Sequence, residues 1–94
     1  MRVLLVEDEE KVSRFVRRGL EAERYAVDVA SDGKQAVEFA ATYPYDLIVL
    51  DLMLPGMSGT EVLRQVRQIN NQVPVLILTA RDALGVHSKN SIFV

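Results

Sequence analysis

Four short runs of apolar residues recur along the chain and alternate with three amphipathic segments. The runs cover Val3–Val6, Val27–Ala30, Leu47–Leu50 and Val73–Leu78. Each run is nearly continuous, which is typical of strands that are buried on both faces. Strands that alternate with helices predict a parallel sheet whose crossover connections are right-handed.

The segments between these runs have helical periodicity. The first helix is expected at about Glu9 to Glu23, and its inward stripe is formed by Val12, Phe15, Val16 and Leu20. The second and third helices are expected at about 33–42 and 59–69. Ser58 and Glu61 have the S-x-x-E spacing of a capping box, in which each side chain bonds to the other residue's backbone N–H.

The periodic pattern stops at Ala83. Residues 83–94, with the sequence ALGVHSKNSIFV, have neither a clear helical period nor a long strand run, and only Ser91–Val94 has the composition of a short strand. The sequence therefore predicts one domain over residues 1–82, followed by an atypical C-terminal tail.

Polar residues stand directly after three of the predicted strands. Glu7 and Asp8 follow the first strand, Asp51 follows the third and Thr79 follows the fourth. Sites in open α/β sheets form at the carboxyl ends of the strands, near the point where the strand order reverses. If these strands are neighbours, three carboxylates and a hydroxyl meet at one edge. Taken alone, Glu7 and Asp8 could instead cap the first helix, and Thr79 could be only a β-branched strand residue.

Three carboxylates in one place repel one another, and a divalent cation removes that conflict. Oxygen ligands favour a hard metal, and Mg²⁺ uses one or two carboxylates while it keeps several waters. The acids therefore predict a Mg²⁺ site at the strand ends. Asp51 would be a metal-neutralised nucleophile that takes a phosphoryl group as a mixed anhydride, and the Thr79 hydroxyl could donate to a phosphoryl oxygen.

Three stretches of the chain, in their order and spacing, resemble the receiver domain of bacterial two-component response regulators. They are LLVEDEE at 4–10, DLIVLDLMLPGMSG at 46–59 and VPVLILTA at 73–80. MRVLLVEDEE and LDLMLPGMSG are most similar to the subgroup whose receivers precede a winged-helix DNA-binding domain. The resemblance implies a flavodoxin-like α/β fold, a doubly wound parallel sheet with four strands in the order 2-1-3-4, three helices and the tail.

The resemblance also implies a role for each site residue. Asp51 would accept the phosphoryl group from a histidine kinase. Glu7 and Asp8 would hold Mg²⁺ directly or through water, and Asp51 and the backbone carbonyl of Met53 would be further ligands. Thr79 would contact the phosphoryl group and shift on activation.

One departure from the family leaves two other functions open. Receivers continue through a fourth helix, a fifth strand with an essential Lys and a fifth helix, and we expect this chain to be truncated before them. Lys89 does not match the family's Lys-Pro context. Without that Lys, the alternative is a non-phosphorylating protein-interaction module. A phosphatase is disfavoured because its second acid would stand two positions after Asp51, where the chain has Met53.

The expected truncation also predicts self-association. Loss of the fifth helix would uncover apolar surface beside Phe15 and Val16, and the fourth strand would be a hydrophobic edge unless the tail pairs with it. We expect a homodimer formed through that exposed edge, the uncovered face or a crossing of residues 84–94. The alternative is a monomer in which Ser91–Val94 adds a short fifth strand.

Composition and charge exclude several other classes of function. The 94 residues carry a net charge of -2, which gives no general attraction to nucleic acid or to an anionic membrane. The longest apolar runs are too short to span a bilayer, and the chain has no cysteine. We expect a cytoplasmic signalling domain that is not an enzyme beyond its own phosphorylation. It would itself bind no nucleic acid and would control transcription through an output domain.

Overall fold

Strands and helices alternate along the part of the chain that the structure describes. The computed structural model describes the backbone of residues 1–79 and 90–93 and the side chains of residues 1–78. In chain order the elements are β1 (Arg2–Val6), α1 (Glu10–Ala22), β2 (Ala26–Ala30), α2 (Gly33–Thr42), β3 (Leu47–Asp51), α3 (Gly59–Ile69), β4 (Val75–Thr79) and β5 (Asn90–Phe93). None of the helices in this described part is long and apolar enough to cross a membrane.

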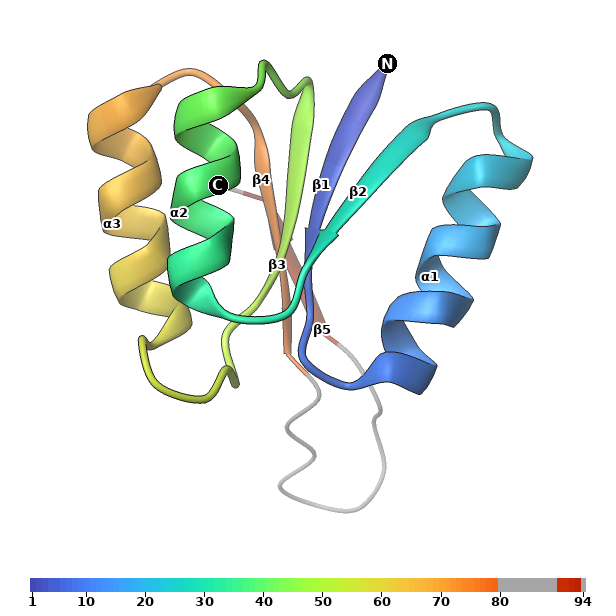
Figure 1. Cartoon of the computed structure of the whole chain (residues 1–94), viewed down its shortest axis with the longest axis horizontal. Coiled ribbons are helices and arrows are strands. Elements are labelled where there is room, and N and C mark those ends of the chain that lie inside the picture. Colours follow the sequence, from blue (N-terminus) through green and yellow to red (C-terminus); the bar gives the residue numbers. More distant parts are fainter. Residues whose placement is uncertain (80–89, 94) are drawn as a thin grey trace.

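The strands form one sheet in the order β2-β1-β3-β4-β5 (Figure 1). Strands β1 to β4 pair in parallel, so the expected order 2-1-3-4 is confirmed. Strand β5, which the four-strand expectation lacked, pairs antiparallel with β4 and places Phe93 opposite Leu76. Only residues 80–89 separate the two strands, whereas a parallel return needs a crossover of a dozen or more residues. The described part of the tail therefore covers the β4 edge, as the alternative of a short fifth strand at Ser91–Val94 predicted, although the strand begins one residue earlier.

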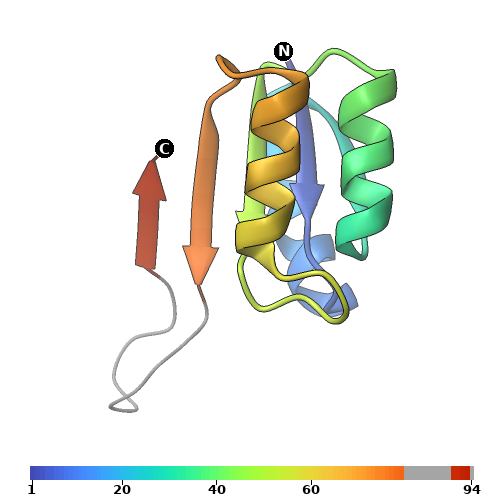
Figure 2. The same cartoon turned by 90° about the vertical axis from the view of Figure 1, so that its left-hand side faces the viewer.

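Helices cover both faces of the sheet, as a doubly wound fold requires (Figures 1 and 2). Helices α2 and α3 lie on one face and α1 lies on the other. Successive strand residues face opposite ways, so one continuous apolar run supplies both layers. Leu4, Val6, Ile48 and Leu50 are buried with Val62 and Val66 of α3, whereas Val3, Leu5 and Val49 pack with Val16 and Leu20 of α1.

Phe15 does not lie inside, although the helical stripe predicts that it does. Its side chain is 80% exposed, whereas Val12, Val16 and Leu20 are half-buried and Ser13 is buried. Two residues of helix correspond to a rotation of 200°, so Phe15 lies about 160° around α1 from Ser13. The sheet therefore contacts the Ser13 side of α1 and leaves Phe15 at the surface.

Side-chain caps begin two of the helices. The Asp32 carboxylate accepts the N–H of Gln35 at 2.8 Å, and the Ser58 hydroxyl accepts the N–H of Glu61 at 3.1 Å. The reciprocal half of the predicted capping box is absent from the described bonds, because the Glu61 carboxylate accepts hydrogen bonds from Arg64 instead. That guanidinium lowers the pKa of Glu61 to about 2. One half of the box is sufficient to start α3.

Gly59 permits a close approach between the start of α3 and the end of β3. A Cβ at this position would lie 2.5 Å from the Cα of Leu52 and 3.0 Å from the carbonyl oxygen of Asp51. The obstructing atoms are backbone, so they cannot rotate away as a side chain would. Gly59 therefore fixes the path of the chain directly after Asp51.

We predict that Gly59→Ala destabilises the domain by about 1–3 kcal/mol, because the added methyl group overpacks a backbone contact. Gly19 is the matched control, since no heavy atom of the described residues lies within 4 Å of its Cβ position in α1. Gly19→Ala should instead stabilise by about 0.5–1 kcal/mol through helix propensity. Urea unfolding followed by circular dichroism measures both changes, and equal effects would contradict this account.

Candidate metal and phosphoryl site

The parallel register of β1 and β3 brings the predicted acids together. Val6 pairs with Leu50, so the residues that follow them, Glu7 and Asp51, are next to each other at the carboxyl edge of the sheet. Leu78 pairs with Asp51, which puts Thr79 at the end of β4 on the same edge. The backbone therefore brings the ends of β1, β3 and β4, where the predicted site residues stand, to one edge of the sheet.

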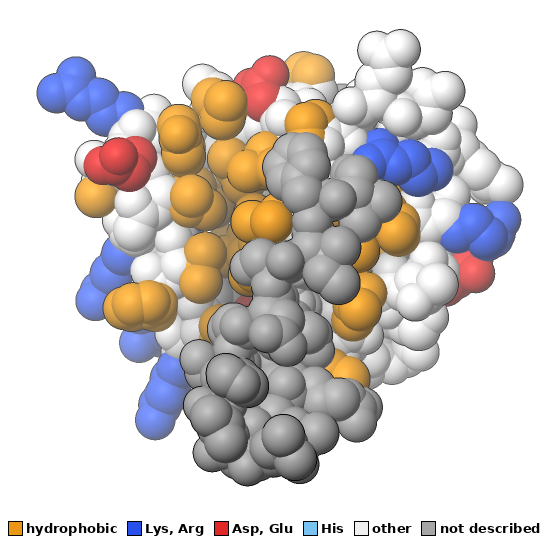
Figure 3. Space-filling model, turned by 180° about the vertical axis from the view of Figure 1, so that it is seen from behind, with side chains coloured by type: hydrophobic (Ala, Val, Ile, Leu, Met, Phe, Trp, Pro, Cys, Tyr) orange, Lys and Arg blue, Asp and Glu red, His pale blue; other side chains and the backbone are white. Residues whose placement is uncertain are grey.

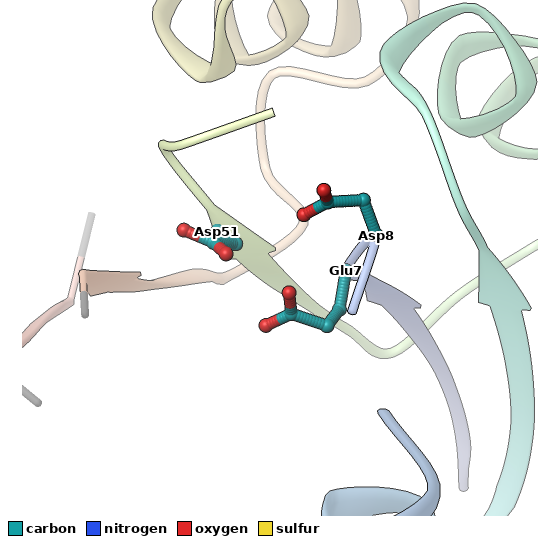
Figure 4. Close-up of side chains that lie close together, drawn as sticks. All are labelled: Glu7, Asp8 and Asp51. Atoms are coloured by element: carbon teal, nitrogen blue, oxygen red, sulfur yellow. The ribbon is translucent and has the colours of Figure 1, made fainter. Parts of the chain in front are cut away.

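Three carboxylates converge at this edge. One carboxylate oxygen from each of Glu7, Asp8 and Asp51 lies within 4.8 Å of the other two. Figure 4 shows the three side chains at the adjoining ends of β1 and β3, directed toward one region. Glu7 is 4% exposed and Asp51 is 5% exposed, whereas Asp8 lies at the surface. Two buried acids and one exposed acid therefore form a group that solvent reaches from the Asp8 side.

Backbone N–H groups orient the two buried carboxylates. Met53 N donates to the Oδ1 atom of Asp51 at 2.9 Å, and Glu9 N donates to the Oε2 atom of Glu7 at 3.1 Å. In both cases the donor stands two residues after the acid, which is the Asx-turn pattern and its Glu counterpart. These N–H groups were not expected as site groups, although an acid at a strand end is a signal for such a turn.

The other predicted site groups lie at the same edge or outside the description. The backbone of Met53 adjoins Asp51, and its side chain is half exposed, which agrees with a backbone role. Thr79 is the last residue of β4, and its side chain lies outside the described residues. Lys89 lies outside them entirely. Met53 and Thr79 therefore stay predictions as ligand and donor.

The acid group suits Mg²⁺ in chemistry and in size. Its donors are all carboxylate oxygens, which a hard cation prefers. Mg²⁺ holds its ligands at about 2.0–2.1 Å, so oxygens on opposite sides of the ion are roughly 4 Å apart. The observed span of 4.8 Å fits if at least one carboxylate binds through a coordinated water. Glu7, Asp8 and Asp51 are thus the residues that would hold the ion.

Comparison with known proteins identifies the class of domain. Residues 3–90 match the model of the response regulator receiver domain family. The chain is 48% identical over 82 residues to an uncharacterized transcriptional regulatory protein of Bacillus subtilis, YkoG, covering 87% of this chain and 36% of that protein. It is 48% identical over 89 residues to the transcriptional regulatory protein QseB of Haemophilus influenzae, covering 95% of this chain and 40% of that protein.

The fold is also similar to that of a solved response regulator structure. The response regulator TrrA of Thermotoga maritima, crystallised in complex with Mg²⁺-BeF, is 33% identical and has a TM-score of 0.82, over 86% of this chain and 70% of that one. The chain therefore belongs to the response regulator receiver domain family. It spans about 36% to 40% of the length of the two regulators of transcription.

We predict that Mg²⁺ raises the melting temperature of the wild-type chain and raises that of Asp8→Asn by much less. A cation that binds only the folded state stabilises it by an amount that rises with the logarithm of its concentration relative to its dissociation constant, and the substitution removes one ligand charge. Glu38→Gln, an exposed change on α2 away from the acids, is the control. A shift of equal size in Asp8→Asn and in the control would contradict the metal site.

Proposed function

We propose that this receiver domain accepts a phosphoryl group on Asp51 from a histidine kinase in a Mg²⁺-dependent reaction. Phosphorylation would then switch a transcriptional output in the cytoplasm. One observation carries the proposal: the buried Asp51 carboxylate is oriented by the Met53 N–H and lies within 4.8 Å of two other carboxylates. A buried nucleophile beside two acids suits a reaction in which a metal neutralises the site before an anionic phosphoryl group arrives.

In the proposed transfer step, Asp51 is the nucleophile. An oxygen of Asp51 attacks the phosphorus of a phosphohistidine, an O–P bond forms and the P–N bond breaks. The electron pair leaves on the imidazole nitrogen, which takes up a proton, and Asp51 becomes a mixed anhydride. Mg²⁺ held by Glu7, Asp8, Asp51 and the Met53 carbonyl would neutralise the charge that gathers there. The Thr79 hydroxyl would donate to a phosphoryl oxygen.

Two alternative functions differ from the proposed one in how they treat the phosphoryl group. A phosphatase needs an acid to assist hydrolysis, and the position two residues after Asp51 is occupied by Met53. The phosphoaspartate is therefore expected to persist. A non-phosphorylating interaction module, which the unmatched Lys context favours, would bind Mg²⁺ but take up no phosphoryl group.

We predict that incubation with Mg²⁺ and acetyl phosphate adds one phosphoryl mass to the wild-type chain and none to Asp51→Asn. Asp46→Asn is the matched control, because Asp46 stands at the opposite end of β3. This variant should be phosphorylated to the same extent as the wild type. Mass spectrometry of the intact chain measures the addition. Phosphorylation of Asp51→Asn would refute the assignment, and Mg²⁺ binding without phosphorylation of the wild type would favour the interaction module.

A homodimer formed through the α1 face is also part of the proposal. Phe15, 80% exposed, borders a shallow hollow lined by Phe15, Val16, Arg18, Gly19 and Leu20. Phe15 and Gly19 are one helical turn apart, so two antiparallel α1 helices could each insert Phe15 into the other's hollow. A contact of this kind, in which the same patch serves both partners, is what two-fold symmetry requires.

Further apolar surface supports the same contact. Leu76 and Leu78 of β4 are only partly buried on the α1 face of the sheet. Hydrophobic side chains gather on both sides of the residues drawn in grey (Figure 3). Large exposed apolar patches are uncommon on monomers, so exposed apolar side chains on this face favour a partner.

We predict a dimeric mass by light scattering at micromolar concentration, and a monomeric mass for Phe15→Ser. Tyr43→Ser is the control, because Tyr43 is a surface aromatic residue at the opposite end of the fold from the acid site and away from α1. A well-folded wild-type monomer would overturn the dimer. A dimer that persists in Phe15→Ser would indicate that the two chains meet through the tail or through the β5 edge instead.

A further inference from the structure

A second pocket opens at the amino edge of the sheet, the edge opposite the acids. Its volume is about 300 Å³, at the lower end of the range for small-molecule sites. Its floor is apolar and buried, formed by Ile48, Val66 and Val73. Its rim consists of the last residues of α2 and α3, which run side by side and end at the same edge (Figure 1). The pocket is independent of the phosphoryl site.

The end of α2 presents carbonyl groups to this pocket. The Ala40 carbonyl would normally accept the N–H four residues on, but that residue is Pro44, which has none. The N–H three residues on, that of Tyr43, donates to Phe39 instead. No basic residue stands in the last turn of α2. The carbonyl oxygens at this helix end, which carry its partial negative charge, are therefore available to another hydrogen-bond donor.

The end of α3 also leaves helix carbonyls without their usual donors, although Arg67 stands in its last turn and donates to the Asn70 carbonyl at 3.3 Å. The N–H groups of Gln72 and Val73 would be the helical donors for Gln68 and Ile69, but both donate to the side chain of Asn70. Two helix C-termini with carbonyl oxygens not used by their own helices thus meet at one apolar pocket. A helix C-terminus carries roughly half an elementary negative charge, which Arg67 offsets in part at α3 but no basic residue of the last turn offsets at α2, so the pocket favours a cation that brings N–H donors.

This edge already attracts guanidinium groups from the chain itself. The guanidinium carbon of Arg2 lies 4.7 Å from the centre of the Tyr43 ring, and Arg67 donates to the Val73 carbonyl at 2.6 Å. Both are otherwise engaged, since Arg2 also forms an ion pair with Asp28 at 2.8 Å. Their positive charges repel a further cation and so weaken its binding in part. The contact of Arg2 with the Tyr43 ring shows that this aromatic wall can bind a guanidinium group.

The walls of the pocket are held in place before any ligand arrives. Tyr45 is buried and donates its hydroxyl to Asp28 at 2.7 Å. Burial and that hydrogen bond raise the pKa of Tyr45, so the phenol stays protonated and the bond is kept even above the pH at which a free tyrosine ionises. Arg67 secures the opposite wall through its bond to Val73. A preformed site costs little to order when a ligand binds.

We propose that this pocket binds a small amphipathic cation. Its flat apolar body would lie on the floor formed by Ile48, Val66 and Val73, and its amidinium or ammonium group would lie at the two helix C-termini. Benzamidine is a probe with these features. Benzoate has the same shape and the opposite charge, and benzyl alcohol has no charge. The order of affinity should be benzamidine first, benzyl alcohol second and benzoate last.

Nuclear magnetic resonance of the ¹⁵N-labelled full chain in saturating Mg²⁺ tests this order. Benzamidine should shift the amide resonances of residues 40–43, 45 and 69–73 saturably, and benzoate should leave them unchanged. Equal shifts with both probes, or no shifts, would overturn the proposal. Shifts confined to Glu7, Asp8 and Asp51 would also overturn it, because the cation would then be bound by the acids.

A charge reversal at the rim provides the second measurement. Ile69 is 43% exposed, so both substitutions should leave the fold intact. Ile69→Lys should weaken benzamidine binding and Ile69→Glu should tighten it, each by about three- to tenfold, as a unit charge a few ångströms away requires. Thr60→Lys and Thr60→Glu, exposed changes at the opposite end of α3, are the matched controls and should change nothing. Changes of the same sign in both Ile69 variants would refute an electrostatic role of the rim.

Discussion

Parallel pairing of β1 with β3 is the constraint on which the site depends. Parallel strands end at the same edge, and the register that pairs Val6 with Leu50 makes Glu7 and Asp51 neighbours although they are far apart in the sequence. Apolar packing on both faces sets that register, because a slip of one residue would turn each strand's side chains to the wrong layer. The core that stabilises the sheet thereby also positions the acids.

The same constraint makes the two edges of the sheet chemically different. Each crossover helix runs antiparallel to the strands, so helices begin at the carboxyl edge and end at the amino edge (Figure 1). At the carboxyl edge, backbone N–H groups orient the carboxylates of Glu7 and Asp51. At the amino edge, the terminal carbonyls of α2 and α3 adjoin a pocket floored by Ile48 and Val73. Cations suit both edges, through carboxylates at one and helix dipoles at the other.

The fifth strand gives the sheet a different edge from the one that four strands alone would have. Pairing of β5 with β4 satisfies backbone groups that an open β4 would expose. The short connection permits only an antiparallel return, so the start of β5, at Asn90, lies beside Thr79 at the carboxyl edge. The α1 face is not completed in this way, since Phe15 stays exposed and Leu76 and Leu78 are only partly buried.

The amino-acid sequence by itself determined how the described helices and parallel strands follow one another along the chain, and the acids at the strand ends. Both follow from local signals, namely apolar period and the residue that ends each run. Boundaries moved by a residue or two, as at β4, which begins after Pro74 because proline cannot donate to the ladder. Tertiary structure alone decided that Phe15 faces solvent, that Glu61 bonds to Arg64 and that Tyr45 bonds to Asp28. These outcomes depend on helix rotation, on competition among nearby partners and on strand register, which the periodicity of a single segment does not contain.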